Sequence, residues 1–260
     1  MLPNDLRAEF RKYFTVVRAT TPEMTDAAHR IRHEIYCAEL GFEPVRDDAR
    51  ERDEFDIHAE HLLIRRAGEG AFVGCARVVL PRDADFALPV EKSGAWKAGR
   101  PLRDDSGHAR VAESSRLGVV REFRRRKGEQ GLPVTVSDSD FGTPDRPRFP
   151  HIPVGLYLAA LAIAQERSVA ELVVLTETRL ANHFGHMGVH LEQVGDAVEF
   201  HRMRAPYLMR VTQTIERLSP PIRALYDDIH ADVAGQRPGA TLAFVAPGAG
   251  NRDAQHRPAT

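Results

Sequence analysis

One apolar stretch, residues 153–164, limits most strongly what this chain can fold into. It is about half as long as the roughly 20 apolar residues that span a membrane, so we expect a buried helix over 154–167 instead. A strand-like run of sequence ELVVLT follows at 171–176. A buried helix beside a buried strand is typical of an α/β layer. The sequence therefore predicts a sheet that is covered by helices.

Cap and turn signals divide the rest of the chain into further elements. Thr20 and Glu23 form a predicted capping box, and Pro22 fits the first turn, so a helix is expected over 22–39. Gly68-Glu69-Gly70 has the composition of a hairpin turn. The other expected elements are strands at 61–64, 72–80 and 110–120, a polar acidic loop at 41–56, a short helix at 181–187, a hairpin of 191–194 with 198–211, and a helix at 218–229.

The composition is that of an ordinary globular protein, with 260 residues of which 42% are hydrophobic and 28% charged. We expect one domain over 1–232 with a loop insertion at 129–150, and a disordered tail at 233–260. The net charge of -1 gives no field that would attract a nucleic acid or an anionic membrane. Only Cys37 and Cys75 are present and residues 1–10 are polar, so we expect a cytoplasmic protein without disulfides.

Charged residues on the expected strands are the most informative for function. Arg77, Glu113 and Arg116 lie where a strand normally carries apolar side chains, and a buried charge needs a partner. Partners are available from the acidic loop and the first helix, namely Asp53, Asp56 and Arg32. One interpretation is a structural ion network, and the other is a functional cleft.

Glu113 is the candidate general base. A regular strand would place Glu113 and Arg116 on opposite faces, because side chains alternate with a period of two, and one bulge would bring them together. A partly desolvated carboxylate suits the removal of a proton from an attacking amine. The alternative is a salt bridge from Glu113 to Arg77 or Arg116.

Two further patterns contain residue types that bind ligands. His183, His186 and His190 have helical spacing, but Gly185 and Gly188 interrupt the helix and no carboxylate or cysteine completes the set, so we expect no metal site. A basic run follows the strand at 110–120 and could bind a phosphate at a helix start or form a solvated turn. It contains Arg121, Arg124, Arg125, Arg126, Lys127 and Gly128.

Four motifs stand in order along the chain: Arg32-His33-Glu34-Ile35-Tyr36 with Phe42, Asp53-Glu54-Phe55-Asp56, Val73-Gly74-Cys75-Ala76-Arg77, and Glu113-Ser114-Ser115-Arg116. Taken together they resemble the acyl-homoserine-lactone (autoinducer) synthases and the related N-acyl amino acid synthases, which share the GNAT acyltransferase fold. The resemblance covers about residues 15–127. The segment from Phe200 to Tyr207 is similar to the group found alongside PEP-CTERM/exosortase systems.

Two departures from the family pattern refine the expectation. Tyr36 and Phe42 stand where signal synthases usually carry Phe and Trp, and the second half of the chain does not resemble theirs closely, which counts against homoserine lactone production. The phosphate loop of GNAT enzymes has its first glycine at Gly128 but lacks the second, which disfavours an ordinary acetyl-CoA enzyme.

The resemblance implies a central, mostly antiparallel, twisted mixed sheet flanked by helices. It implies that an acyl thioester on the phosphopantetheine of acyl carrier protein, or acyl-CoA, lies in a V-shaped opening between the strands at 110–120 and 171–176. A backbone N–H near Leu117 to Val119 would hold the oxyanion, and Glu113 would be the base. No permanently bound cofactor is expected.

The same resemblance assigns the remaining residues. Arg32, Asp53, Asp56, Arg77 and Arg116, with Tyr36 and Phe42, would order the N-terminal loop over the acceptor amine. Residues Arg124 to Gly128 would meet the pantetheine phosphate or the acidic carrier surface. The small residues Gly155, Ala159, Ala160 and Ala164 would leave room for a fatty chain.

The sequence is therefore compatible with three functions. The first is a fatty N-acyltransferase that acts on an amino acid or a related amine. The second is an acyl-homoserine-lactone synthase that uses S-adenosylmethionine. The third is a non-catalytic module that binds acyl thioesters or carrier protein, in which the charge network is structural only.

Overall fold

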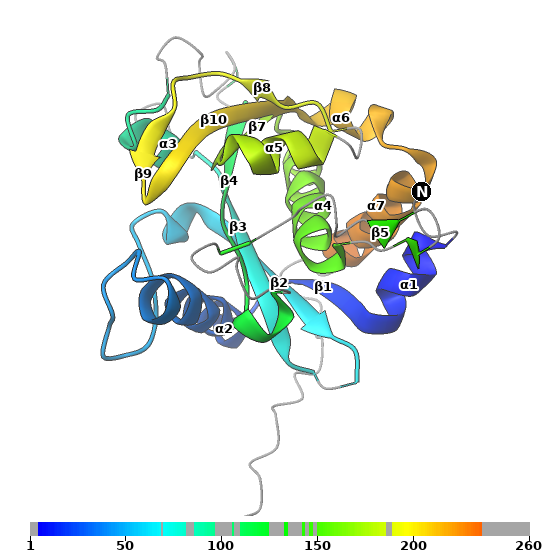
Figure 1. Ribbon diagram of the computed structural model, residues 1–260, viewed down its shortest axis with the longest axis horizontal. Coiled ribbons are helices and arrows are strands. Elements are labelled where there is room, and N and C mark those ends of the chain that lie inside the picture. The colour runs from blue at the N-terminus through cyan, green and yellow to red at the C-terminus, as the bar shows by residue number, and fades with distance from the viewer. Residues whose placement is uncertain are drawn as a thin grey trace, which may run out of the picture.

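The computed structural model describes residues 5–68, 70–81, 86–96, 106, 110–124, 133–134, 142–143, 146–147, 150–185 and 189–235. An open twisted sheet runs through the molecule, and helices lie on both of its faces (Figure 1). This confirms the expected mixed, mostly antiparallel sheet flanked by helices.

The central sheet has the strand order β1-β2-β3-β4-β7-β10-β8, with β9 paired to β10. All the pairs are antiparallel except β4 with β7, which is parallel. The strands are β1 Phe14–Arg18, β2 Ala59–Arg66, β3 Phe72–Val79, β4 Val111–Val119, β7 Glu171–Thr176, β8 Glu192–Gln193, β9 Val198–Phe200 and β10 Arg202–Arg210. A separate pair is formed by β5 Gly142–Thr143 and β6 Arg146–Pro147, inside the predicted loop insertion.

The helices are α1 Leu6–Tyr13, α2 Pro22–Arg32, α3 Pro89–Lys92, α4 His151–Glu166, α5 Thr178–Gly185, α6 Val211–Arg217 and α7 Pro220–Gly235. A π-helix, His33–Glu39, continues α2, so the predicted helix over 22–39 is present in two segments. The N-cap is Thr21 and not Thr20, because Pro22 occupies the first helical position and the Thr21 side chain accepts the Met24 N–H at 3.3 Å.

The parallel pair at the centre opens into a V. Strands β4 and β7 are paired only from Val111 with Glu171 to Glu113 with Val173. Beyond Glu113, β4 continues to Val119 alongside β3 alone, while β7 remains paired with β10. The two central strands therefore part at their carboxyl ends, where unpaired backbone and side chains can face a ligand.

A β-bulge interrupts β4 at this opening. The register with β3 shifts by one residue between Ser115, which faces Arg77, and Gly118, which faces Cys75. Arg116 lies in the extra position with a φ of 53°, which a non-glycine residue seldom adopts. The strand therefore bends at the point where the sequence places its charged residues.

Helix α4 forms the centre of the main core. Every residue from Ile152 to Ala164 is buried, and α2 and α4 pack against β2, β3 and β4 from opposite sides (Figure 1). Gly155 admits the Phe10 ring of α1, since a Cβ at Gly155 would lie 2.7 Å from the Phe10 Cε2 atom. The expectation that the small residues of α4 leave room for a fatty chain is therefore wrong for Gly155, because another helix already fills that space.

Helix α7 extends to Gly235 with Val233 buried, so the first three residues of the predicted disordered tail are helical. The remainder of the predicted tail lies outside the described residues. Among the helices that the structure describes, none has the length and apolar character needed to cross a membrane.

Candidate active site

A pocket of about 140 Å³ lies in the V between β4 and β7. Glu113 to Leu117 line it from β4, and Val174 to Thr176 line it from β7. The other lining residues come from the π-helix, the region around α3, α4, α5, the β9–β10 hairpin and connecting segments: Tyr36, Pro89, Ser93, Pro133, Val134, Tyr157, Glu177, Arg179, Leu180, Phe184, Phe200 and Arg204. The pocket therefore has a wall of mixed polarity with one apolar end, where Tyr157 stacks on Phe184.

Glu113 is a buried carboxyl group in this pocket, only 3% exposed. Its Oε2 atom accepts the Val90 N–H at 2.7 Å. Burial raises the pKa of Glu113 to about 8, and the Val90 hydrogen bond and the charges of Arg77 and Arg116 offset only part of this effect. Glu113 can therefore gain or lose a proton near neutral pH. The salt bridge that was the alternative for Glu113 does not form with either described arginine.

Arg116 turns away from Glu113 toward three carboxylates. Its Nη2 atom lies 3.1 Å from Glu43 Oε1, 3.1 Å from Glu51 Oε1 and 3.3 Å from Asp53 Oδ2. The guanidinium carbon also lies 5.6 Å from the centroid of the Tyr36 ring. The bulge thus places Arg116 on the pocket wall while its charge is balanced by the loop after the π-helix.

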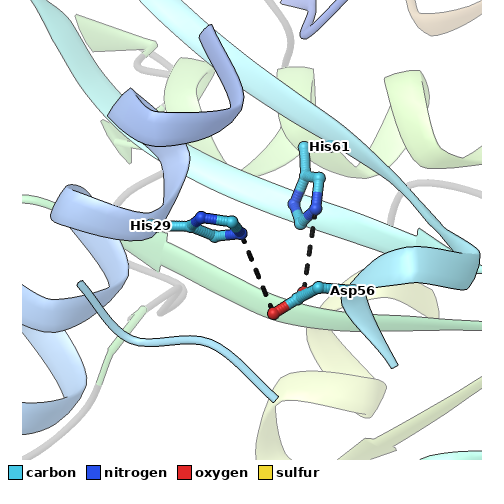
Figure 2. A group of neighbouring side chains, drawn as sticks. All are labelled: His29, Asp56 and His61. Atoms are coloured by element: carbon cyan, nitrogen blue, oxygen red, sulfur yellow. Dashed lines mark ion pairs between the residues drawn. The ribbon is translucent and has the colours of Figure 1, made fainter. Parts of the chain in front are cut away.

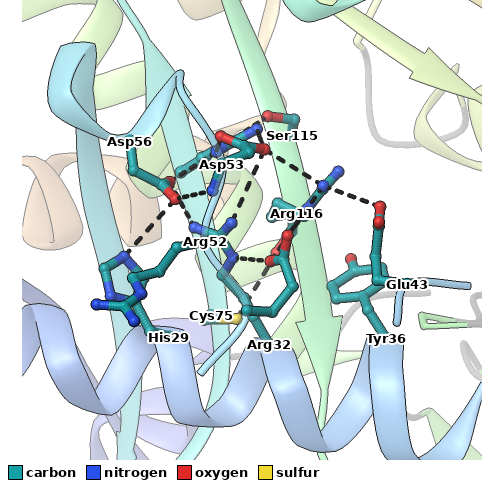
Figure 3. Close-up of polar contacts among 12 residues, drawn as sticks. His29, Arg32, Tyr36, Glu43, Arg52, Asp53, Asp56, Cys75, Ser115 and Arg116 are labelled. Atoms are coloured by element: carbon teal, nitrogen blue, oxygen red, sulfur yellow. Dashed lines mark hydrogen bonds and ion pairs between the residues drawn. The ribbon is translucent and has the colours of Figure 1, made fainter. Parts of the chain in front are cut away.

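Arg77 and Arg32 bond to acids of the same loop. Figure 3 shows Arg32 and Arg116 beside Asp53 and Asp56 of this loop. Arg77 Nη1 donates to Asp53 Oδ1 and Asp56 Oδ1, both at 2.6 Å, and its Nε donates to Ser115 Oγ at 3.0 Å. Arg32 is fully buried and donates to Glu51 Oε2 and Asp56 Oδ1, both at 2.5 Å. The two strand arginines, the helix arginine and the loop acids therefore form one network.

This network lies beside the pocket and does not line it, except at Arg116. The four expected site residues Arg32, Asp53, Asp56 and Arg77 bond to one another and to Ser115 and Glu51. Such buried pairs require partners because an isolated charge is costly to bury. The structure brings these residues together, and their bonds hold the loop against the sheet. We call this network of Arg32, Arg77, Arg116 and the acids of the loop the clasp.

Tyr36 and Phe42 connect the π-helix to both sides of the V. The Tyr36 hydroxyl donates to the Leu117 carbonyl at 2.9 Å, and burial raises the pKa of that hydroxyl. Phe42 stacks on His201 in the β9–β10 turn, with ring centroids 4.5 Å apart and an angle of 6° between the planes. The loop after the π-helix therefore reaches across to the hairpin on the far side of the pocket.

Backbone donors on β4 differ from one expected position to the next. The Val119 N–H donates to the Pro133 carbonyl at 2.9 Å, and Val119 does not line the pocket. Its N–H is therefore already used in this structure and does not serve as the expected oxyanion donor. Leu117 lines the pocket.

The basic run is described only at its beginning. Arg124 forms an ion pair with Glu39 at the end of the π-helix. Arg125, Arg126, Lys127 and Gly128 lie outside the described residues. Of the histidines weighed as metal ligands, His183 is buried in α5 and His190 is exposed, while His186 is also outside the described part of the chain.

A different group, His29, Asp56 and His61, has metal-ligating donor atoms within 4.8 Å of one another (Figure 2). The Asp56 oxygens, however, already accept hydrogen bonds from Arg32, Arg77 and the Asp53 N–H. Burial and the Arg32 charge lower the pKa of His61 to about 3, which shows how unfavourable a further positive charge is at this point. The residues present therefore do not fit a cation, and we assign them to the clasp.

Comparison with known proteins agrees with this geometry. Residues 31–133 match the family model described as an acetyltransferase (GNAT) domain. The chain is 26% identical over 176 residues to an acyl-homoserine-lactone synthase of Ralstonia nicotianae (strain ATCC BAA-1114 / GMI1000), which covers 67% of this chain and 76% of the relative. The protein is an acyltransferase with the GNAT fold.

Solved structures share the fold of this acyltransferase. TofI, in a ternary complex with an inhibitor and MTA, has a TM-score of 0.55 at 22% identity, over 80% of this chain and 98% of TofI. BjaI, a CoA-dependent acyl-homoserine lactone synthase with SAM and isopentyl-CoA, has a TM-score of 0.53 at 15% identity, over 84% of this chain and 89% of BjaI.

Sequence reasoning missed several polar residues of the acyltransferase. Glu43 and Glu51 neutralise Arg116 and Arg32, yet they lie in a loop without periodicity where acidic residues are frequent. Burial alone would raise the pKa of Glu51, and Arg116 and Arg32 instead lower it to about 2. The one available signal was charge balance, because three arginines near the core require more acids than Asp53 and Asp56 supply.

Proposed function

We propose that this acyltransferase moves a fatty acyl group from acyl carrier protein or acyl-CoA to the amino group of an amino acid or a related amine. The observation that carries the proposal is Glu113, a buried carboxyl group in the V-shaped pocket with a pKa of about 8. A general base works best when its pKa lies near the operating pH.

The acyl thioester would lie between β4 and β7, where the pocket opens between strands that have parted. Leu117 lines the pocket and precedes Val119 by two residues on β4. The Leu117 N–H is thus the proposed donor to the developing oxyanion. A donor of this kind is worth on the order of 3 kcal/mol of transition-state stabilisation.

Glu113 would take the proton released during the attack. The amine nitrogen forms a bond to the thioester carbonyl carbon, and the carbon–sulfur bond breaks as the tetrahedral intermediate collapses. A proton passes from nitrogen to the Glu113 carboxylate, directly or through one water, and the thiolate leaves and is protonated. Catalysis in this scheme needs no group beyond the two substrates and the chain.

The loop clasp would position the acceptor. Arg32, Asp53, Asp56 and Arg77 hold the loop against the sheet, and Arg116 brings that network to the pocket wall. Tyr36 and Phe42 would close the acceptor side, since they contact Leu117 and the hairpin turn. These residues act in the proposal by orientation, which accounts for a large part of the rate gain in reactions between two substrates.

The carrier is proposed to approach from the end of β4. Arg124 follows that strand, and the basic residues after it would meet the phosphate of pantetheine or an acidic carrier surface. The similarity of residues 200–207 to the PEP-CTERM/exosortase-associated group belongs to this proposal as well, as do the expected cytoplasmic location and the single domain over 1–232.

The first test compares lipid extracts of cells that express the wild-type chain, Glu113→Gln or Glu199→Gln by mass spectrometry. We expect new N-acyl amino acids with the wild type and with Glu199→Gln, because Glu199 is exposed on β9 and does not line the pocket. Glu113→Gln should form about 100- to 10,000-fold less product, because a general base usually contributes a rate factor of this size. A folded Glu113→Gln protein with full turnover would remove Glu113 from the proposed role.

A second candidate is an acyl-homoserine-lactone synthase that uses S-adenosylmethionine. The observation that favours it is the sequence similarity to the Ralstonia synthase. The two candidates share the acyl transfer and differ in the acceptor. Release of methylthioadenosine together with acyl homoserine lactones from the purified protein would select the second candidate, and N-acyl amino acids without it would select the first.

A further inference from the structure

The charges that line the pocket are not equally balanced. The five charged lining residues are Glu113, Arg116, Glu177, Arg179 and Arg204. Arg116 is saturated by three carboxylates of the chain, and Arg179 is exposed at the rim. Arg204 is the half-buried cation of this set. The question is therefore which negative charge neutralises it.

Arg204 lies on β10 just before Ala205, which pairs with Thr176 at the end of β7. It therefore faces the V from the side opposite Glu113, Arg116 and Leu117 on β4. Its guanidinium carbon lies 5.9 Å from the centroid of the Phe42 ring. Among the residues that the structure describes, no carboxylate forms an ion pair with Arg204.

The pKa of Arg204 reflects this burial. Burial lowers the pKa of Arg204, and the nearby Tyr36 and Glu177 do not compensate for it. A half-buried guanidinium presents a rigid fork of N–H donors that matches a carboxylate with two parallel hydrogen bonds. Arg204 lines the same pocket as Glu113.

We propose that Arg204 binds the carboxylate of the acceptor while Glu113 receives the proton from its amino group. This inference rests on the proposed function and narrows it, because the acceptor must then carry an anionic group beside its amine. The pocket would select α-amino acids over plain amines, amino acid amides and amino acid esters. Arg204 is thus a specificity-determining residue on the wall opposite the base.

The donor phosphate is the other anion that an acyl-thioester enzyme meets. In the proposed function it lies beyond the end of β4, near Arg124, and no residue of η3 (Arg121–Phe123) or Arg124 lines the pocket. The acceptor side of the V is therefore the position that Arg204 serves. The two sources of anion give different kinetic results, since one belongs to the acceptor and the other to the donor.

The test uses the purified full chain with one acyl thioester and two matched acceptor panels. One panel holds the common α-amino acids, and the other holds the corresponding amino acid amides, which keep the amine and lose the carboxylate. We expect the wild type to prefer the best amino acid over its amide by about 10- to 100-fold in kcat/KM, the worth of a hydrogen-bonded charge pair.

Three variants then assign the preference to the residue. Arg204→Gln should raise the KM for the amino acid by about 10- to 100-fold and leave the amide and the acyl thioester within about twofold. Arg204→Lys should recover part of the loss, because it keeps the charge and loses the fork. Arg202→Gln is the matched control, since Arg202 is exposed on the same strand and does not line the pocket.

The outcomes separate this inference from the function on which it rests. Equal use of amino acids and amides, or a preference that survives in Arg204→Gln, would overturn the role of Arg204 and leave N-acyl transfer intact. A rise in the KM for the acyl thioester alone would assign Arg204 to the donor and overturn the inference. No amide product from either panel would overturn both.

Discussion

Two glutamates near the pocket show how strongly the surroundings set the chemistry of one residue type. Burial raises the pKa of Glu113 to about 8, because its carboxyl group has the Val90 N–H and only distant positive charges. Burial acts in the same direction on Glu51, yet direct bonds from Arg116 and Arg32 lower its pKa to about 2. One carboxyl group is therefore free to exchange a proton, and the other stays ionised as part of the clasp.

The raised pKa of Glu113 makes a prediction for the pH dependence of turnover. The base form is the carboxylate, so its fraction rises as the pH rises and levels off above the pKa of about 8. Because the acceptor amine also titrates, the ratio of wild-type to Glu113→Gln turnover should be measured from pH 6 to 9.5. We expect this ratio to rise about tenfold per unit below pH 8 and to become constant above it.

A ratio that does not change with pH would contradict the role of Glu113 as base. A midpoint near the ordinary pKa of glutamate would contradict the effect of burial.

At the scale of elements, the contact between α1 and α4 explains why small residues occur on α4. Gly155 lies against the Phe10 ring and the Ile64 side chain, so the two helices and β2 approach closely at this point. A side chain larger than hydrogen has no space there. The glycine serves packing between elements, and the pocket contacts α4 through Tyr157.

We therefore expect Gly155→Ala to lower the free energy of unfolding by about 1–3 kcal/mol, as overpacking of a core does. The new Cβ would lie 2.7 Å and 2.9 Å from two Phe10 ring atoms. Urea unfolding should show the loss, and Phe10→Leu in the same chain should reduce its size because it removes the ring. Gly185→Ala is the matched control, because a Cβ at that helical glycine meets nothing within 4 Å.

Helix propensity by itself favours Ala over Gly, so Gly185→Ala should not lose stability. No loss in Gly155→Ala, or a loss of the same size with and without Phe10→Leu, would contradict the contact with Phe10 as the cause.

At the scale of the whole molecule, the clasp joins the first helix, the acidic loop and two strands into one unit. Arg32 comes from α2, Arg77 from β3 and Arg116 from β4, and all three bond to carboxylates of the loop. His29 and His61 lie against Asp56 at the back of this unit. Protonation of these two histidines in acid should therefore weaken this unit.

The direction in which stability changes with pH at this site follows from the lowered pKa of His61. In the folded protein burial and the Arg32 charge lower its pKa to about 3, whereas the unfolded value is about 6.5. The unfolded chain then binds more protons at this group, so the contribution of His61 to stability is complete above pH 6.5 and falls as the pH drops from 6.5 toward 3. The lowered pKa of His29 acts in the same direction. From pH 7.5 to pH 5, His61 alone should cost roughly 2 kcal/mol of unfolding free energy.

Urea unfolding at several pH values between 5 and 7.5 measures the slope of stability with pH. The raised pKa of Glu113 contributes a slope of opposite sign in this window, so the contribution of His61 is the difference in slope between the wild type and His61→Asn. His190→Asn should leave the wild-type slope unchanged because His190 is exposed. Glu51 titrates near pH 2, below this window, so it contributes little here. The same slope in the wild type and in His61→Asn would refute this origin of the acid sensitivity.

The pattern of residues along the chain was sufficient to predict most of the helices and strands. The apolar run of α4, the strand of sequence ELVVLT and the hairpin at Gly68 to Gly70 follow from side-chain period and turn composition. The cap of α2 was placed one residue early, because either of two adjacent threonines could serve and only the backbone decides which one does. The position of the bulge at Arg116 depended on pairing with β3, which no local pattern records.

The order of the motifs along the chain, the kinds of residues in them and the class of fold were determined by the sequence alone, because each depends on local propensity or on resemblance. The tertiary structure decided which carboxyl group is kept neutral and which is paired, and that the Val119 N–H is used by Pro133. It also decided that Arg204 lines the pocket without an ion pair to any other residue that the structure describes. These properties depend on burial and on contacts between residues far apart in the chain. Electrostatic energies inside a protein depend on the distance between charges and on their surroundings, which residue type alone does not give.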